Sequence, residues 1–427
     1  MMPRDPTSID ISLLKETIEH RNLSNSNSPE HLSINQLHRK QYLRKLLDLS
    51  RKASEVIRKG LSQIKALILA GGFGTRLRPL SCYRPKLLFP IAGKPIIDWV
   101  LDGLSKNGID EAILATNYLD DMIKDHLGKR YGKVRLHYSL EEKPLGTGGA
   151  IKEAERFLRG EKFFFVLNGD IVSSPPLRQI LHQHTRKKAT VTIMLKKVED
   201  PTHFGVARLG KETKIIQFVE KPRLEDAPSR WINAGVYLLN SEIFSYLSPR
   251  TKSSIEKEVF PVLASSGKLF GYKYAAEWFD IGRFSEYRKA NNVILSREAG
   301  SEPRIAPGAE VKIPTKLIPP LTISGGSRVE QATLGPYTSV GKKALIHEGS
   351  RISESILFDK VIVGKNSTIR GAIIGESVFI GNNVRIGENC VIGDHVFIHD
   401  NIAIKHDVRI CPYKEVHRSI DRPGIVS

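Results

Sequence analysis

Residues 66–95 read ALILAGGFGTRLRPLSCYRPKLLFPIAGKP, and this stretch decides how the chain around it folds. It begins with five apolar residues, 66–70, a run short enough to form a buried strand. The run leads directly into a glycine-rich turn at 71–75, where missing side chains let backbone N–H groups approach a bulky anion. Arg76 and Lys86 follow and supply positive charge. We therefore predict a triphosphate site at the carboxyl end of this strand.

Two common phosphate-binding motifs do not fit the glycine turn. The segment lacks the G-x-x-x-x-G-K-[ST] pattern, and Leu77 stands where a dinucleotide fingerprint beginning at Gly72 requires its third glycine. A glycine turn alone could be only a tight connection. Arg76, Arg78 and Lys86 beside it would, however, repel one another without an anion, and this favours a phosphate-binding role.

The composition limits the class of protein. A chain of 427 residues can form two or three domains, and the three widely spaced cysteines form neither a disulfide framework nor a zinc site, which predicts a cytoplasmic protein. Because no apolar run reaches 18 residues and the start lacks an apolar signal segment, we expect no membrane insertion. The net charge of +19 is spread along the chain without an RNA-binding aromatic motif. We therefore expect anionic small substrates rather than nucleic acid.

The first 63 residues form an extension that differs from the rest of the chain. Residues 22–29, NLSNSNSP, are typical of a flexible linker. Over 33–61, apolar residues are interleaved with Lys and Arg, which predicts a basic amphipathic helix or helix pair. We expect this helix to pack on the neighbouring domain or on a partner subunit, since the aromatic anchors of a membrane-surface helix are missing.

Strand and helix patterns alternate over residues 64–300. The strand candidates are 66–70, 111–116, 134–138, 163–168, 190–195, 215–219 and 234–239, and the helix candidates are 96–107, 119–127, 148–158 and 176–187. This alternation predicts a Rossmann-like, three-layer α/β domain with a mostly parallel sheet. In such sheets ligands bind at the carboxyl ends of the strands.

After residue 300 the pattern changes to a repeat of six residues. Isoleucine occupies seven consecutive sixth positions from 374 to 410, and a small apolar residue follows each of the first six after four positions. This repeat predicts a left-handed parallel β-helix over 301–427, with weaker turns placing its start before residue 340. Cys390 falls on a core position of the repeat. We expect the faces and the end of such a coil to support assembly into a homo-oligomer.

Two aspartates occupy positions suited to a divalent cation. Asp170 follows the apolar strand at 163–168, and Asp280 lies in the segment WFDIG at 278–282. Metal-assisted phosphoryl chemistry needs paired oxygen ligands of this kind, and Mg²⁺ is the cofactor we expect. Either aspartate alone could instead be a turn former or a helix cap.

Together these segments resemble the sugar-nucleotide pyrophosphorylases, nucleotidyltransferases that join a nucleoside triphosphate to a sugar 1-phosphate. The resemblance covers roughly residues 64–297, with a β-helix beyond as in many members. Its motifs are the glycine turn with RPK at 84–86, GTGGA at 146–150, LNGD at 167–170, FVEKP at 218–222 and INAGV at 232–236. Residues 201–206 and 254–261 look most like mannose-1-phosphate guanylyltransferases.

The resemblance implies a role for individual residues. The catalytic residues would be Arg76, Lys86 and Lys221, and the metal ligands Asp170 and Asp280. The nucleotide-binding residues would be Leu69, Ala70, Gly71, Gly72, Gly74, Thr75, Gly146 and Thr147. The sugar-binding residues would be Gly205, Glu220, Lys221 and Asn233.

The sequence thus predicts an enzyme that forms a nucleotide sugar and pyrophosphate, with GTP and mannose 1-phosphate as the preferred pair. The wording GTGGAIKEA at 146–154 also suits enzymes acting on glucose 1-phosphate, so thymidylyl or uridylyl transfer stays open. Two other interpretations remain. The β-helix could be an acyltransferase with His395, His399 or His406 as base, or the protein could be a catalytically silent regulatory subunit.

Overall fold

The computed structural model of the protein describes residues 61, 63–117, 119–249 and 251–426. The linker at 22–29 and, apart from Leu61, the predicted basic helix at 33–61 lie outside the described residues.

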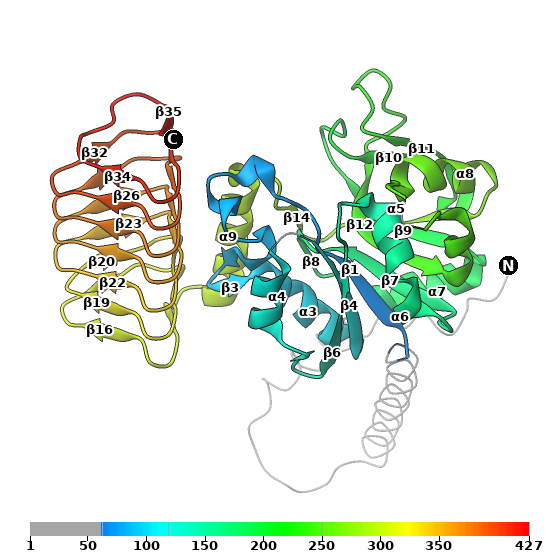
Figure 1. Ribbon diagram of the computed structural model, residues 1–427, viewed down its shortest axis with the longest axis horizontal. Helices are drawn as coiled ribbons and strands as arrows, with labels where there is room; N and C mark the ends of the chain where they lie inside the picture. The colour runs from blue at the N-terminus through cyan, green and yellow to red at the C-terminus, as the bar shows by residue number, and fades with distance from the viewer. Residues whose placement is uncertain (1–60, 62, 118, 250, 427) are drawn as a thin grey trace, which may run out of the picture. The chain divides into compact units, whose positions relative to one another are not determined.

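A ten-stranded sheet forms the centre of the α/β domain (Figure 1). Its central strand β1 (Lys65–Leu69) pairs in parallel with β4 (Glu111–Thr116) on one side and with β7 (Phe163–Asn168) on the other. Strand β6 (Val134–Leu140) continues the parallel half, and β5 (Arg130–Tyr131) closes that edge. The interior of β1 is buried on both faces, as expected for a continuous apolar run in a parallel sheet.

The other half of the sheet is largely antiparallel. Strand β12 (Trp231–Asn240) runs antiparallel to β7, to β9 (Val191–Lys197) and to β10 (Gly205–Leu209). Strand β10 in turn forms a hairpin with β11 (Ile215–Glu220). The prediction of a mostly parallel sheet is therefore wrong for this half, because the connection at 210–214 is too short for the crossover that parallel strands need. The remaining strands of the domain are β2 (Pro90–Ile91), β3 (Lys94–Pro95), β8 (Ile171–Ser173), β13 (Leu269–Tyr274) and β14 (Trp278–Asp280).

Helices on both faces of the sheet complete three layers (Figure 1). Within β1, Ala66 and Ile68 belong to one apolar core and Leu67 to the other, because side chains of a strand alternate between its faces. The first core is covered by α3 (Ile96–Asn107), α4 (Asp120–Leu127), α7 (Leu177–Lys187) and α9 (Phe284–Ala299). The second is covered by α5 (Gly146–Glu153), α6 (Glu155–Leu158) and α8 (Phe260–Ser265).

Helix α3 shows how the local sequence fixes an element. Asp98 in its first turn and Lys106 in its last turn match the partial charges of the helix ends. Gly108 then takes the left-handed conformation (φ 87°), and its N–H bonds back to the carbonyl of Leu104, which ends the helix.

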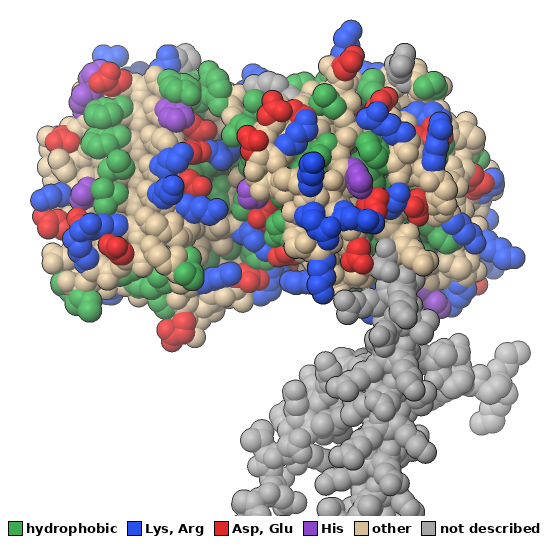
Figure 2. Space-filling model, turned by 60° about the horizontal axis from the view of Figure 1, so that its bottom comes forward, with side chains coloured by type: hydrophobic (Ala, Val, Ile, Leu, Met, Phe, Trp, Pro, Cys, Tyr) green, Lys and Arg blue, Asp and Glu red, His purple; other side chains and the backbone are tan. Residues whose placement is uncertain are grey.

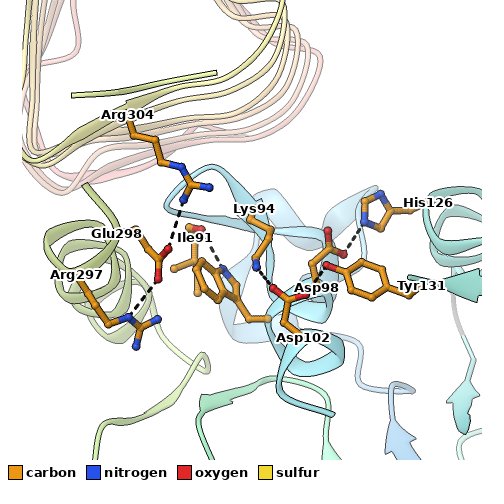
Figure 3. A network of polar contacts seen from close by, with 10 residues as sticks. Ile91, Lys94, Asp98, Asp102, His126, Tyr131, Arg297, Glu298 and Arg304 are labelled. Atoms are coloured by element: carbon orange, nitrogen blue, oxygen red, sulfur yellow. Dashed lines mark hydrogen bonds and ion pairs between the residues drawn. The ribbon is translucent and has the colours of Figure 1, made fainter. Parts of the chain in front are cut away.

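Polar side chains fasten α3 to the elements beside it (Figure 3). Asp98 Oδ1 lies 2.7 Å from His126 Nε2 of α4, and Asp102 accepts a hydrogen bond of 3.0 Å from the Tyr131 hydroxyl. Asp102 also pairs with Lys94. These contacts hold the first helix layer against the parallel edge of the sheet.

Residues 304–426 form a parallel β-helix made of three stacked sheets (Figure 1). Stacked residues are 17 or 18 positions apart, as in Ile356 over Ile373 and Ile373 over Val391, except in the last pair of strands, where they are 16 apart. Every predicted ladder residue between 374 and 410, Cys390 included, lies in one buried core. The sheets run from β15 (Arg304–Ile305) to β35 (Gly424–Val426), from β16 (Glu310–Lys312) to β34 (Glu415–Val416), and from β17 (Lys316–Leu317) to β32 (Ala403–Ile404).

Asn291 of α9 links the α/β domain to the β-helix. This side chain is fully buried, and its Oδ1 accepts hydrogen bonds of 2.9 Å from both the Ala92 N–H and the Ser339 hydroxyl. Ser339 lies in coil strand β21 (Thr338–Val340), whereas Ala92 follows β2. A buried polar residue also breaks the apolar pattern of α9, which explains why the sequence does not predict this helix.

Arg84 makes a second link, from the segment that carries Arg76 and Lys86. Its guanidinium pairs with Glu376, and its Nε lies 3.9 Å from Asp394 of the same coil face. The guanidinium also lies 5.7 Å from the centre of the Phe358 ring. The β-helix therefore holds the middle of this segment in place.

The positive charge of the chain does not form one continuous surface on the face shown in Figure 2. Lys and Arg side chains are interspersed there with Asp and Glu side chains. In the described part of the chain, no helix is both long and apolar enough to cross a membrane.

Replacing Asn291 by leucine is expected to lower stability. The change leaves the Ala92 N–H and the Ser339 hydroxyl buried without an acceptor, and each such loss costs about 1–3 kcal/mol. We expect the thermal midpoint to fall by roughly 4–8 °C. Lys289→Ala, at an exposed position of the same helix, is the control. Equal melting of the two variants would show that this link contributes nothing to stability.

Candidate active site

Two adjoining cavities open at the carboxyl ends of β1 and β7. The first encloses about 300 Å³ and the second about 620 Å³. Gly146, Thr147, Asn168 and Asp170 line both of them. Ligands occupying the two cavities would therefore meet at these four residues.

The first cavity lies between the glycine turn and the start of α5. Leu87, Pro144 and Ala150 give it apolar walls, and Lys86 and Asp170 lie at its polar end. The predicted site residues that line it are Leu69, Ala70, Gly71, Gly72, Lys86, Gly146, Thr147 and Asp170. Phe73, Glu141 and Asn168 also line it and carry no predicted role.

Gly146 must be a glycine for local reasons. Its φ of +72° lies in the left-handed region, and a Cβ there would come within 2.5 Å of the Ser253 carbonyl oxygen. This close approach lets the N-terminus of α5 form the common edge of the two cavities.

The second cavity lies over β14 and the ends of β11 and β12. The predicted residues that line it are Arg76, Gly146, Thr147, Asp170, Gly205, Glu220, Lys221, Asn233 and Asp280. His203, Phe204, Ser254, Glu256, Lys257 and Trp278 also line it and carry no predicted role.

Gly74 and Thr75 line neither cavity. Gly74 has a φ of 59°, and its carbonyl accepts a hydrogen bond of 2.7 Å from the Ser81 hydroxyl. Thr75 begins the short 3₁₀ turn that follows. Their visible contribution is to shape the turn, and direct contact with a nucleotide remains a prediction.

Strand pairing brings the two predicted metal ligands together. Strands β8 and β14 run antiparallel with Asp280 opposite Ile171, the residue after Asp170. Burial raises the pKa of Asp280, and the neighbouring Asp170 raises it further, while Lys86 and Arg76 act in the opposite direction. Lys86 pairs directly with Asp170.

This carboxylate pair suits a divalent cation. Both side chains offer the oxygen ligands that Mg²⁺ and similar hard cations prefer. The negative charge of Asp170 helps to raise the pKa of Asp280, because the two carboxylates repel each other. A bound cation would offset this repulsion. Asp170 and Asp280 would therefore be the residues to hold it.

Gly205, Glu220 and Lys221 lie together on the β10–β11 hairpin. A Cβ on Gly205 would approach Glu220 Oε2 to 2.7 Å and the Phe218 ring to 2.4 Å, so this position admits no side chain. Burial raises the pKa of Glu220, Glu256 adds to the effect, and Lys221 lowers it. Lys221 Nζ lies 3.5 Å from Glu220 Oε1 and stays largely exposed, so it can turn toward an anion in the cavity.

Glu256 organises the wall between the two cavities, although no role was predicted for it. Its carboxylate accepts hydrogen bonds from the hydroxyls of Thr147, Ser254 and Tyr237, the latter two at 2.7 and 3.4 Å. The Tyr237 hydroxyl also accepts a bond of 2.8 Å from the Asn233 amide. The segment at 254–261, SIEKEVFP, is singled out in the sequence analysis and contains Glu256. Only the fold shows that the Glu256 side chain lies against Thr147.

Glu141 is a second residue that sequence reasoning missed. It lies five residues before Gly146, lines the first cavity, and is only 6 % exposed. Its Oε2 accepts a hydrogen bond of 3.0 Å from the Leu145 N–H. Burial raises the pKa of Glu141, that hydrogen bond lowers it, and Glu153 raises it.

The three histidines considered as acyltransferase bases lie on the outside of the coil. His399 Nε2 is 2.7 Å from Glu415, and His406 Nδ1 is 2.7 Å from Asp407. His395 stacks on an aromatic ring at 4.7 Å. Each thus has a partner within the coil surface.

Comparison with known proteins agrees with this architecture. Residues 65–297 match the sequence profile described as "Nucleotidyl transferase", and residues 317–426 match the one described as "GMPPB C-terminal domain". The chain belongs to the nucleotidyl transferase family. The relatives described next are named as enzymes that transfer a nucleotidyl group to a sugar 1-phosphate.

Similar family members share most of their length with this chain. A protein of Oryza sativa subsp. japonica named probable mannose-1-phosphate guanylyltransferase 3 is 33 % identical over 371 residues, 85 % of this chain and 100 % of the relative. The mannose-1-phosphate guanylyltransferase catalytic subunit beta of Dictyostelium discoideum is 34 % identical with the same coverage. A mannose-1-phosphate guanylyltransferase of Mycobacterium tuberculosis is 33 % identical over 70 % of this chain and 81 % of its own.

Solved structures share the α/β domain. A putative glucose-1-phosphate thymidylyltransferase from Bacillus anthracis matches with a TM-score of 0.50 and 29 % identity, over 55 % of this chain and 96 % of that one. A UDP-glucose pyrophosphorylase matches with the same TM-score at 23 % identity, which shows a shared fold.

Glu141→Gln is expected to stabilise the protein at neutral pH. A carboxyl group whose pKa is raised by folding favours the folded state below its unfolded pKa, and that contribution is lost as pH rises through the folded pKa. Glutamine carries no charge and can still accept from the Leu145 N–H. The thermal midpoint of the variant should therefore exceed that of the parent at pH 8, with a difference that shrinks toward pH ~4.3.

The matched control for this comparison is Glu142→Gln, which removes an exposed carboxylate next in sequence. Its midpoint should follow the parent at every pH. A Glu141→Gln midpoint that also follows the parent from pH 5 to 8 would contradict the assigned cost of burial.

Proposed function

We propose that this protein transfers a guanylyl group from GTP to mannose 1-phosphate and releases pyrophosphate, which makes GDP-mannose. The observation that carries the proposal is the common edge of the two cavities at Thr147 and Asp170. A nucleoside triphosphate in the first cavity and a sugar phosphate in the second would meet there. Relatives named mannose-1-phosphate guanylyltransferase, which this chain covers along their whole length, support the choice of substrates.

In the proposed arrangement the nucleotide occupies the first cavity. The glycines at 71–72 let backbone N–H groups approach the phosphates, and Lys86 and Arg76 balance the negative charge of the triphosphate. Leu69, Ala70, Gly146 and Thr147 contact the nucleoside, and Gly74 and Thr75 shape the turn that holds it.

Glu141 supports guanine as the base. Guanine offers two adjacent donors, N1–H and the 2-amino group, which one carboxylate can accept together. Thymine and uracil offer a single N–H flanked by two carbonyl oxygens, which a buried carboxylate would repel. Glu141 lines the first cavity, and only its Oε2 accepts from Leu145.

The sugar phosphate occupies the second cavity in this proposal. Glu220 and Asn233 would accept or donate hydrogen bonds to its hydroxyl groups, while Gly205 leaves room for the ring. Lys221 would turn from Glu220 toward the sugar phosphate and orient its attacking oxygen.

The proposed reaction is an in-line displacement at the α-phosphorus. An oxygen of the sugar phosphate forms the new P–O bond, and the bond to the β-phosphate breaks and leaves its electron pair on pyrophosphate. No general base is needed, since the attacking oxygen is already anionic. Mg²⁺ bound by Asp170 and Asp280 would supply neutralisation of the charge on the reacting phosphates.

Further parts of the proposal concern organisation. We place the domain boundaries after residues 63 and 300, and we expect the β-helix to support a homo-oligomer. A cytoplasmic location fits the three cysteines, Cys82, Cys390 and Cys411, which form no disulfide in the described part of the chain.

The proposed function is tested with a matrix of nucleoside triphosphates and hexose 1-phosphates, read by pyrophosphate release. GTP with mannose 1-phosphate should give the highest turnover. A higher turnover with dTTP or UTP and glucose 1-phosphate would replace the substrate assignment, and no turnover with any pair would indicate a silent subunit.

Glu141→Gln should change the base preference in this matrix. An amide donates where a carboxylate accepts, so the variant should lose at least about tenfold in kcat/KM for GTP and less for UTP. Glu142→Gln should keep the parental ratio. An unchanged ratio for Glu141→Gln would exclude this residue from base recognition.

Asp280→Asn should keep the fold and lose about a hundredfold or more in turnover, because an amide is a weaker ligand for a divalent cation. Melting temperature and pyrophosphate release at several Mg²⁺ concentrations measure the two effects separately. Asp226→Asn, at an exposed loop position, is the control. Full activity of Asp280→Asn in the presence of EDTA would contradict the proposed metal site.

A further inference from the structure

A third cavity, about 430 Å³ in volume, lies between the start of α9 and the outer face of the β-helix. Four arginines line it: Arg76, Arg283, Arg288 and Arg409. Arg76 comes from the loop after β1, the next two from the start of α9, and Arg409 from coil strand β33 (Val408–Ile410). We call this space the arginine cavity.

Within the described residues, none of these four arginines forms an ion pair with a carboxylate within 4 Å, and the cavity gathers all four around one space. Asp407 is the single carboxylate that lines the cavity, and its Oδ2 is 2.7 Å from His406 Nδ1. The lining of the cavity therefore contains four arginines and one carboxylate, which already has a partner. Such a concentration of like charge is stable when an anion neutralises it.

Neighbouring groups hold three of the four arginines and leave N–H donors available. Arg283 Nη2 lies 2.8 Å from His203 Nε2, a residue of the second cavity. Arg288 Nη1 donates to the Gly371 carbonyl at 2.7 Å and Nη2 to Asn389, so this side chain bridges α9 and the coil. Arg409 lies 5.3 Å from the centre of the Phe284 ring. Each guanidinium carries five N–H donors, and planar pairs of them match the oxygens of a phosphate group.

The arginine cavity is connected to the proposed active site through a short segment. Asp280 belongs to the proposed metal pair, and Arg283 lies three residues further on. Between them, a Cβ on Gly282 would come within 3.0 Å of Arg76 Nη2, so this backbone lies directly against the guanidinium. Arg76 itself lines both the second cavity and the arginine cavity.

We propose that the arginine cavity binds a small phosphorylated metabolite that is neither substrate nor product, and that this ligand slows turnover by drawing Arg76 away from the triphosphate. The binding of the anion depends only on the arginines and the cavity. Its effect on turnover rests on the proposed function. Inhibition should be partial at saturating nucleotide, because Arg76 is one of several groups that hold the triphosphate.

The test uses Arg409→Gln in the full chain. Arg409 contacts the cavity from the coil and has no part in the proposed chemistry, so basal activity should stay unchanged. Calorimetry measures the binding of two probes, inorganic phosphate and glucose 6-phosphate, which lacks the anomeric phosphate and cannot be the nucleophile. We expect the dissociation constant of the tighter probe to rise about tenfold or more in the variant, which corresponds to one lost charge-assisted contact.

Two further variants control the experiment. Arg409→Lys keeps the charge and should restore most of the binding, and Arg385→Gln removes an exposed arginine at an equivalent strand position of another sheet and should bind as the parent does. Tighter binding of glucose 6-phosphate than of phosphate would support an organic phosphate as the ligand, and equal or weaker binding of glucose 6-phosphate would overturn that assignment in favour of inorganic phosphate.

The outcomes separate the inference from the proposed function. Equal binding by the parent and Arg409→Gln, or no binding by the parent, would overturn the inference. Binding that depends on Arg409 but leaves pyrophosphate release unaffected would overturn the coupling through Arg76. A protein that binds the probes through Arg409 but transfers no nucleotidyl group would retain the anion site while the proposed function fails.

Discussion

The pairing of β8 with β14 is the constraint on which the proposed active site depends. It sets Asp280 opposite Ile171 and so beside Asp170, although the two aspartates are far apart in the sequence. The two carboxylates repel each other, and the pairing of Lys86 with Asp170 offsets part of this repulsion. The loop that carries Lys86 must therefore lie against this pair, and the carboxyl end of β1 directs it there. The position of the two aspartates and the charge balance around them thus depend on one short antiparallel contact.

Burial of carboxylates is the price of this arrangement. Desolvation is the largest cause of the raised pKa values of Glu141, Glu220 and Asp280, and all three side chains line the two cavities. Buried charges of this kind lower stability in the free protein and become favourable only when a ligand or cation compensates them. Groups that serve packing alone would not need to be ionised. The cluster therefore marks the cavities as a binding site more clearly than their volume does.

The β-helix takes part in the geometry of the α/β domain rather than simply following it in the chain. Ser339 shares the acceptor of Asn291 with Ala92, and coil residues Glu376 and Asp394 hold Arg84. Since Arg84 lies between Arg76 and Lys86, the coil restrains the segment on which both charges stand. The same junction encloses the arginine cavity. A ligand or a partner that acts on the coil could therefore influence the proposed active site through these contacts.

Local patterns in the sequence determined much of the fold and many of the candidate site residues. The apolar run at 66–70 predicts a strand, and the repeat of isoleucines from 374 to 410 predicts the coil. Both predictions need only neighbouring residues, because an apolar run and a periodic repeat are local properties of the sequence. The glycine turn with Arg76 and Lys86 likewise indicates an anion site from its own composition.

Tertiary structure alone decided the antiparallel half of the sheet, helix α9 with its buried Asn291, and the positions of Glu141 and Glu256 in the cavity walls. These features depend on contacts between distant segments. A glutamate followed by a loop looks the same in sequence whether its carboxylate is solvated or buried against a cavity. Only the packing around it, which sets its desolvation and its hydrogen-bond partners, distinguishes the two.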